Sequence, residues 1–106
     1  MMRKINKKEL ELLTGIAKIF KALNSVENLD LFLQIAEKPI LTTKLKSDLA
    51  KMPLNRRLNI LRDAGLIKRD YIKGKNHPGI ENSLYQRAKK ISRLLLKLRK
   101  QYVKNT

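Results

Sequence analysis

The hydrophobic period of the sequence changes at Gly65, and this change limits the folds that the chain can adopt. Before the glycine, three leucines recur at the helical spacing i, i+4, i+7: Leu54, Leu58 and Leu61. After it, residues 66–72 alternate with a period of about two, which is typical of a β-strand. Glycine is a usual residue just beyond a helix C-terminus. We therefore predict a helix over residues 53–64, with Pro53 at its first position, that leads directly into a strand.

The segments after this strand predict a β-hairpin and a final helix. Turn-forming residues fill positions 73–79, and residues 80–85 form a plausible return strand. We expect Tyr71 and Tyr85 to pack this hairpin onto the helices. A helix over residues 86–104 then closes the chain, with apolar residues on one side and cations on roughly the opposite side.

The residues before Pro53 predict three further helices. Apolar residues at helical spacing indicate helices over residues 8–23 and 26–37, the second with Asn24 or Ser25 as its N-cap. Pro39 ends the second helix, and residues 40–41 form an apolar bridge or a very short strand. A third helix over about residues 44–51 follows, capped by Thr42 or Thr43, with two leucines facing inward: Leu45 and Leu49.

This order of elements resembles the winged helix-turn-helix of prokaryotic (bacterial and archaeal) transcriptional regulators. The resemblance is carried by residues 41–50 and by the run Leu-x-x-Leu-x-x-Ala-Gly-Leu-Ile over residues 58–67. It implies a mostly α fold with a small β-hairpin (α+β), in a single winged-helix domain over residues 1–106. The expected parts are an N-terminal helix, a helix-turn-helix, a wing and a C-terminal dimerisation helix: 1–23, 42–65, 66–85 and 86–104.

The charge of the chain points to a polyanionic partner. The 106 residues include 25 Lys and Arg but only 9 Asp and Glu, which gives a formal net charge of +16. Fifteen of the basic residues lie in the half that begins at Leu54, against three acidic ones. Nucleic acid is the commonest intracellular polyanion, and the resemblance to DNA-binding regulators narrows the expected partner to double-stranded DNA.

Other classes of function lack the residues that they require. The chain has no Cys and one His, so disulfides, zinc fingers and thiol nucleophiles are excluded, and a metal site is not expected. It has no glycine-rich phosphate loop and no nucleophile–His arrangement, so we expect neither an enzyme nor a cofactor. No apolar run is long enough to span a membrane, no signal peptide is visible, and no small-molecule effector is evident. We therefore expect a cytoplasmic, nucleoid-associated protein.

The helix over residues 53–64 is expected to enter the major groove. Arg can pair bidentately with guanine and Asn with adenine, so the outward-facing polar residues of this helix suit base reading. Asp63 could instead pair with Arg62. The start of the third helix could bind a phosphate through its free N–H groups, and the wing tip could contact phosphate or the minor groove. The predicted DNA contacts are Thr42, Thr43, Lys44, Asn55, Arg56, Arg57, Asn59, Arg62, Lys73, Lys75, Asn76 and His77.

The last helix is expected to form a homodimer, because terminal helices pair in regulators of this type and the first helix often joins them. The predicted interface residues form one apolar stripe: Ile91, Leu94, Leu95, Leu98 and Tyr102. The cations on the other side either keep the helix soluble, bind DNA or attract an anionic membrane surface; the last has less support.

Sequence-specific duplex binding by a dimeric transcriptional regulator is the leading interpretation. An architectural or partition-type protein that coats DNA with little specificity is the main alternative, because phosphate neutralisation alone gives affinity. An RNA-binding winged-helix module is a further alternative.

Overall fold

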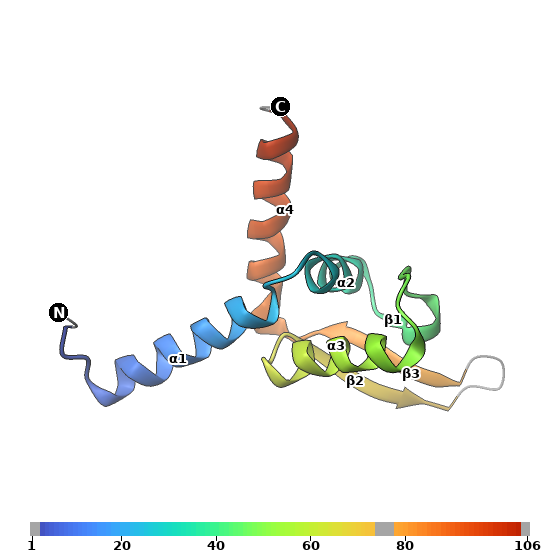
Figure 1. The fold of residues 1–106 in the computed structure, drawn as a ribbon, viewed down its shortest axis with the longest axis horizontal. Coiled ribbons are helices and arrows are strands. Elements are labelled where there is room, and N and C mark those ends of the chain that lie inside the picture. The colour runs from blue at the N-terminus through green and yellow to red at the C-terminus, as the bar shows by residue number, and fades with distance from the viewer. Residues whose placement is uncertain (1–2, 74–77, 105–106) are drawn as a thin grey trace.

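The computed structural model describes residues 3–73 and 78–104 (Figure 1). Apart from residues 44–51, the elements follow the expected order, mostly α with a small β-hairpin. In chain order they are α1 (Lys7–Ala22), α2 (Val26–Glu37), β1 (Ile40–Leu41), the 3-10 turn η1 (Thr42–Lys44), α3 (Lys51–Asp63), β2 (Ile67–Ile72), β3 (Gly79–Leu84), the 3-10 turn η2 (Gln86–Ala88) and α4 (Lys89–Lys104).

The core lies between α2, α3 and a three-stranded antiparallel sheet. The strand order is β1-β3-β2, so residues 40–41, for which either an apolar bridge or a very short strand was expected, form the third strand of the sheet. Leu54, Leu58 and Leu61 of α3 are buried, as their spacing predicts, and meet Phe32 of α2 and Ile67 of β2 in one apolar cluster. The sheet and α2 therefore hold α3 by one side and leave its other side exposed.

The turn at Gly65 has the predicted form. Gly65 has φ of +77°, its N–H donates to the carbonyl oxygen of Arg62 at 2.9 Å, and the N–H of Leu66 donates to that of Leu61 at 3.1 Å. These two bonds satisfy carbonyls at the end of α3 in the Schellman pattern, and the buried side chains of Leu61 and Leu66 complete it. The turn fixes the direction in which β2 leaves α3.

We expect Gly65→Ala to lower the free energy of unfolding by about 1–2 kcal/mol, because alanine is strained in the left-handed region. An added Cβ would also lie 2.6 Å from Nη2 of Arg87, whose flexible end would have to move. Gly15→Ala is the matched control: nothing lies within 4 Å of its added Cβ in helix α1. That change is expected to stabilise by roughly 0.5–1 kcal/mol. Urea unfolding checks both, and equal stabilities would contradict the assigned strain.

The predicted third helix over residues 44–51 is wrong. Only η1 is helical there, Leu45 is already extended, and α3 begins at Lys51, two residues before the predicted start at Pro53. Two interactions favour the irregular chain: Ser47 Oγ accepts from the N–H of Leu49 at 3.0 Å, and the side-chain amide of Gln34 bonds both backbone groups of Lys46. A segment this short gains too little from helix propagation to outweigh them. Leu45 is still buried, as expected.

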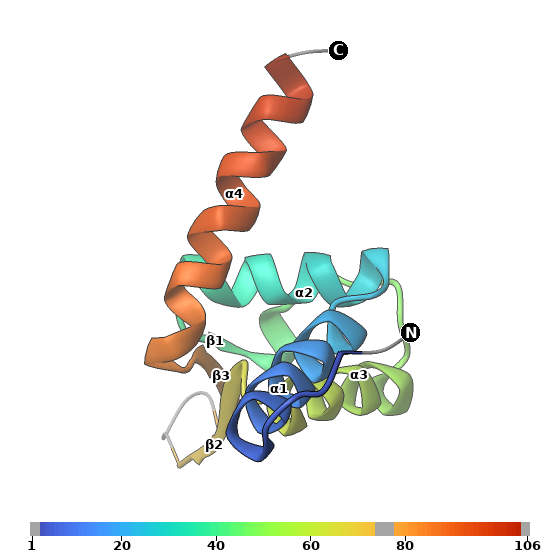
Figure 2. The same ribbon diagram turned by 90° about the vertical axis from the view of Figure 1, so that its left-hand side faces the viewer.

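The terminal helices reach beyond the core. Helix α1 packs through its last turns, at Ile19, Ala22 and Leu23, while its earlier apolar residues are exposed. Helix α4 packs against the core at its start, and its later turns extend away from the rest of the molecule in both views (Figures 1 and 2). The prediction that Tyr71 packs the hairpin onto the helices is also wrong, because β2 extends past the core there and leaves Tyr71 65% exposed. Tyr85 is half-buried and lies beneath Arg87, whose guanidinium carbon is 5.0 Å from the ring centroid.

Candidate nucleic-acid interface

The outer side of α3 presents one exposed cation at its middle and a second near its end. Arg56 is exposed, and Arg62 is exposed but bonded to Asp63, as the sequence suggested, with Nη2 3.1 Å from Oδ1. A shallow surface hollow runs along this side of the helix, and both polar and apolar side chains line it: Lys51, Met52, Asn55, Arg56, Asn59, Ile60 and Asp63. This side can offer hydrogen-bond donors and apolar contacts to a ligand together.

Arg57 lies on a different side of α3 from Arg56. Its Nη1 donates to Ser25 Oγ at 3.3 Å and to Asn28 Oδ1 at 3.1 Å, where α2 begins. Ser25 is the N-cap of α2, as the sequence suggested, and the buried Asn28 also donates to the carbonyl oxygen of Ala22. Arg57 therefore joins α3 to the α1–α2 corner.

A polar cluster that was not predicted from the sequence lies between α3 and the sheet. Arg69 of β2 donates to four neutral oxygens, and we call these five residues the Arg69 cluster. Its bonds are Nε to Asn82 Oδ1 at 2.9 Å, Nη1 to Asn59 Oδ1 at 2.8 Å, Nη2 to Asn55 Oδ1 at 2.7 Å and Nη2 to Thr42 Oγ1 at 3.2 Å. Two predicted DNA-contacting residues of α3 are thus bonded to the sheet behind it.

Asn82 is the fully buried member of this cluster. It lies opposite both Ile40 and Arg69 in the sheet register, and its side chain is 0% exposed. Its Nδ2 donates to the carbonyl oxygen of Ile40 at 3.1 Å and to Thr42 Oγ1 at 3.0 Å. Thr42 in turn donates to the carbonyl oxygen of Ile80 at 3.2 Å, so its hydroxyl is engaged by the cluster and the sheet.

Arg69 is a half-buried cation, and no carboxylate among the described residues pairs with it. Burial, and secondarily repulsion from Arg62, lower its pKa from the usual value for arginine. Arginine nevertheless stays charged at neutral pH. Its positive charge therefore lies directly behind the outer side of α3.

The other predicted contacts lie around α3 or outside the described residues. Thr43 and Lys44 are exposed in η1. Because the third helix expected after them is absent, its free N–H groups and helix dipole cannot bind a phosphate there. Lys73 is exposed at the end of β2. Lys75, Asn76 and His77 lie outside the described residues.

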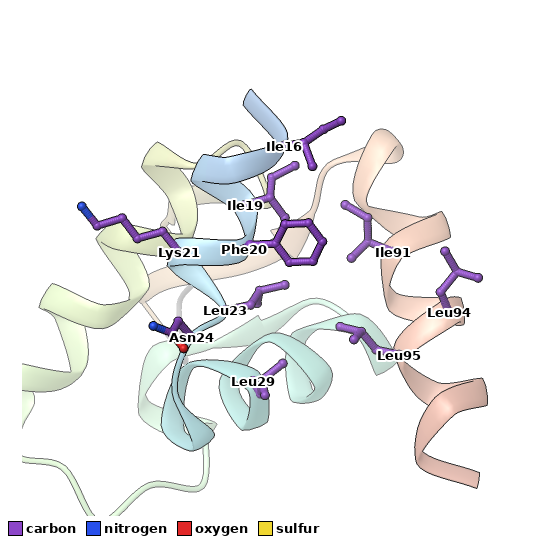
Figure 3. A pocket seen from close by; sticks show the side chains of 10 residues that line it. All are labelled: Ile16, Ile19, Phe20, Lys21, Leu23, Asn24, Leu29, Ile91, Leu94 and Leu95. Atoms are coloured by element: carbon purple, nitrogen blue, oxygen red, sulfur yellow. The ribbon is translucent and has the colours of Figure 1, made fainter. Parts of the chain in front are cut away.

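Helices α1 and α4 border an apolar groove of about 730 Å³ (Figure 3). Phe20 of α1 points across the groove toward Ile91 of α4, with Leu29 of α2 at its base. Of the predicted interface residues, Ile91 and Leu95 are half-buried against the core. The other three are exposed: Leu94, Leu98 and Tyr102.

Two other functional features are absent from the described part of the chain. No group of three or more His, Cys, Asp or Glu residues lies there in an arrangement that could hold a metal ion. None of the helices described is both long and apolar enough to cross a membrane.

Comparison with solved structures identifies the fold. The homodimeric winged helix-turn-helix DNA-binding domain of a possible ArsR-family transcriptional regulator from Mycobacterium bovis superposes with a TM-score of 0.79, at 14% identity over 99% of this chain and 96% of that one. The fold is a winged helix. The transcriptional repressor BigR from Xylella fastidiosa gives a TM-score of 0.68, at 18% identity over 89% of this chain and 96% of that one. For NolR from Sinorhizobium fredii the TM-score is 0.69, at 20% identity over 92% of this chain and 96% of that one.

The sequence itself has no match among protein-family models or curated proteins. At these low identities the structural likeness establishes the winged-helix fold, which confirms the resemblance inferred from residues 41–50 and 58–67. In this winged helix, β2 and β3 form the wing, and α3 is the helix that leads into it.

Proposed function

We propose that this protein is a sequence-specific duplex-DNA-binding protein that acts as a dimeric transcriptional regulator and inserts α3 into the major groove. The observation that carries the proposal is the outer side of α3, where Arg56, Asn55 and Asn59 line one surface hollow. An α-helix fits the major groove, and these side chains suit base edges. The net charge of +16 supplies attraction to the phosphates.

The exposed apolar sides of α1 and α4 support a homodimer. Phe20 is 70% exposed and Leu94 is 67% exposed, and both line the groove of Figure 3. A second copy that covered this groove would remove that apolar surface from water and would leave each α3 free. Two recognition helices one turn of duplex apart would then bind a palindromic site.

Selection of bound duplexes from a random pool at physiological salt tests this proposal. We expect enrichment of a palindrome, because a two-fold dimer presents two copies of α3. A pool that remains random after repeated rounds, despite retention of DNA, would refute sequence-specific binding. A structured RNA pool run in parallel would reveal an RNA-binding module by stronger retention than duplex DNA.

DNA coating with little sequence preference is a second candidate function, and the charge on α4 favours it. The described cations of this helix with exposed side chains extend along most of its length: Lys89, Lys90, Arg93, Lys97, Arg99 and Lys100. They are more numerous than a groove-reading domain needs. The same cations would also serve the regulator, as non-specific phosphate contacts flanking the site.

Arg56→Ala and Lys97→Ala should separate the two candidates. We expect Arg56→Ala to weaken binding to the selected duplex by about 2 kcal/mol, or roughly thirtyfold, with little effect on random duplex. Lys97→Ala should weaken both about equally and reduce the slope of log affinity against log salt by about one. Fluorescence titrations over a salt series measure both quantities. Equal losses on both duplexes for Arg56→Ala would favour the coating protein.

A further inference from the structure

The Arg69 cluster bears on which bases α3 can read. Arg69 Nη1 and Nη2 hold the Oδ1 atoms of Asn59 and Asn55 at 2.8 and 2.7 Å. A guanidinium has donors only, so the amide atom that faces it must be the oxygen. The orientation of both amides is thereby fixed by chemistry, with each Oδ1 turned toward the sheet.

The outward edge of these amides consists of N–H donors. One hydrogen of Asn55 Nδ2 is engaged by the carbonyl oxygen of Lys51 at 2.8 Å, within the helix. For Asn59 Nδ2, the described residues offer no hydrogen-bonded acceptor. Both residues still border the outer hollow together with Arg56. Asn59 therefore has an unused donor at the place where a ligand would lie.

We propose that Arg69 acts as a specificity-positioning residue, which makes Asn59 a hydrogen-bond donor only and directs α3 toward guanine or thymine instead of adenine. This inference rests on the proposed function. An asparagine reads adenine with both amide atoms, accepting from N6 and donating to N7. Because Oδ1 is turned toward Arg69 and the sheet, the amide cannot present that oxygen to N6, and the paired contact is lost.

Guanine and thymine offer acceptors that match the remaining donor. Guanine presents N7 and O6 in the major groove, and thymine presents O4. Adenine places an N6 donor beside N7, which would face another N–H group. The sequence led us to expect that asparagine reads adenine here. The Arg69 bond instead favours guanine or thymine, because Arg69 fixes the orientation of the amide from the sheet side of α3. Arg69 itself does not have to touch DNA.

The Asn82 bond makes this arrangement firm. Asn82 Oδ1 accepts from Nε of Arg69 at 2.9 Å, and the buried amide is held in turn by Ile40 and Thr42. Arg69 is thus held from the sheet side, while its two terminal nitrogens reach α3. A lysine has no planar fork with which to bridge these positions in the same way.

The test compares the sequences selected by the native protein, Asn59→Ala and Arg69→Met. The position at which Asn59→Ala relaxes the preference identifies the base that Asn59 contacts, and we expect guanine or thymine there in the native site. Arg69→Met removes the guanidinium donors from the cluster and frees Oδ1 of Asn59. Acceptance of adenine at that position should then rise about tenfold relative to guanine, whereas the positions that depend on Arg56 should stay unchanged.

The outcomes separate the two proposals. A native pool without enrichment refutes the proposed function, and this inference with it. This inference alone is overturned if the native site is enriched but has adenine at the position that depends on Asn59. It is also overturned if no position depends on Asn59. Both results come from variants other than Arg69→Met, so they hold even if Arg69→Met does not fold. If Arg69→Met keeps the native circular dichroism and the native preference at that position, the inference is likewise overturned. Arg69→Lys, which keeps the charge but not the fork, is expected to shift the preference toward adenine in the same direction as Arg69→Met.

Discussion

The double variant Phe20→Glu, Leu94→Glu is expected to be a monomer and to bind the selected palindrome at least 100-fold more weakly than the native protein. Both side chains border the groove between α1 and α4, and both are largely exposed in the single chain (Figure 3). Glutamates there would have to be buried, as uncompensated charges, in any dimer that covers the groove. A monomer would also lose the gain of roughly 10²–10⁴ that linking two half-site contacts gives.

Val26→Glu is the matched control for this variant. Val26 is 80% exposed, lies in the first turn of α2 and does not border the groove, so the same apolar-to-acidic change should leave mass and affinity unchanged. Light scattering gives the mass, circular dichroism the fold, and titration with the palindrome the affinity. A native mass for the double variant would show that the groove is not the dimer interface. Halved mass with native affinity would instead show that one copy of α3 is enough.

The parts of the fold that were predicted correctly are those specified by local sequence. The leucine spacing of α3, the glycine at its end and the alternation that follows are all contained within residues 54–72, and each residue's preference agrees with its neighbours'. The same is true of Ser25, which caps α2, and of Pro39, before which α2 ends. Where local propensity and burial point the same way, a short stretch of sequence is enough to determine the structure.

The prediction of a helix over residues 44–51 failed because the decisive partner is distant. Leu45 and Leu49 have helical spacing, but Gln34, twelve residues before Lys46, bonds both backbone groups of that residue. Spacing records only which residues could share a helix face, and it contains no information on a side chain that arrives from another element. The apolar side of α1 shows a related limit: its period predicts a helix correctly, yet does not say which surface covers it.

The Arg69 cluster was missed for a similar reason. Asn82 in β3 is not among the predicted site residues, and asparagine is depleted from strands, so its type gave no sign of a role in the sheet. The structure places it opposite Arg69, with both polar atoms of its side chain hydrogen-bonded. The sequence did contain one signal for the cluster. The alternation of each strand puts an arginine and an asparagine on the inner side of the sheet. Recognising it requires the register of β2 against β3, which the sequence alone does not fix.

Asn82→Ala is expected to lower the free energy of unfolding by about 3 kcal/mol, a large effect for one polar side chain. The change leaves the carbonyl oxygen of Ile40 without its bond from Nδ2, removes a donor from Thr42, and deprives Arg69 of the acceptor for Nε. Each buried polar group left unsatisfied costs roughly 1–3 kcal/mol, and more where a charge is involved. Urea unfolding followed by circular dichroism measures the difference.

Ser83→Ala is the control, because Ser83 is the next residue of β3, is only half-buried and has no side-chain hydrogen bond within the described residues. It should change stability by no more than about 0.5 kcal/mol. Equal stabilities for the two variants would mean that water replaces the Asn82 amide and that the cluster is loosely held. A large loss confined to Asn82→Ala would instead identify the cluster as a stabilising join between α3 and the sheet. Arg69 is anchored through this join, so the stability of the fold and the orientation of the α3 amides depend on the same buried side chain.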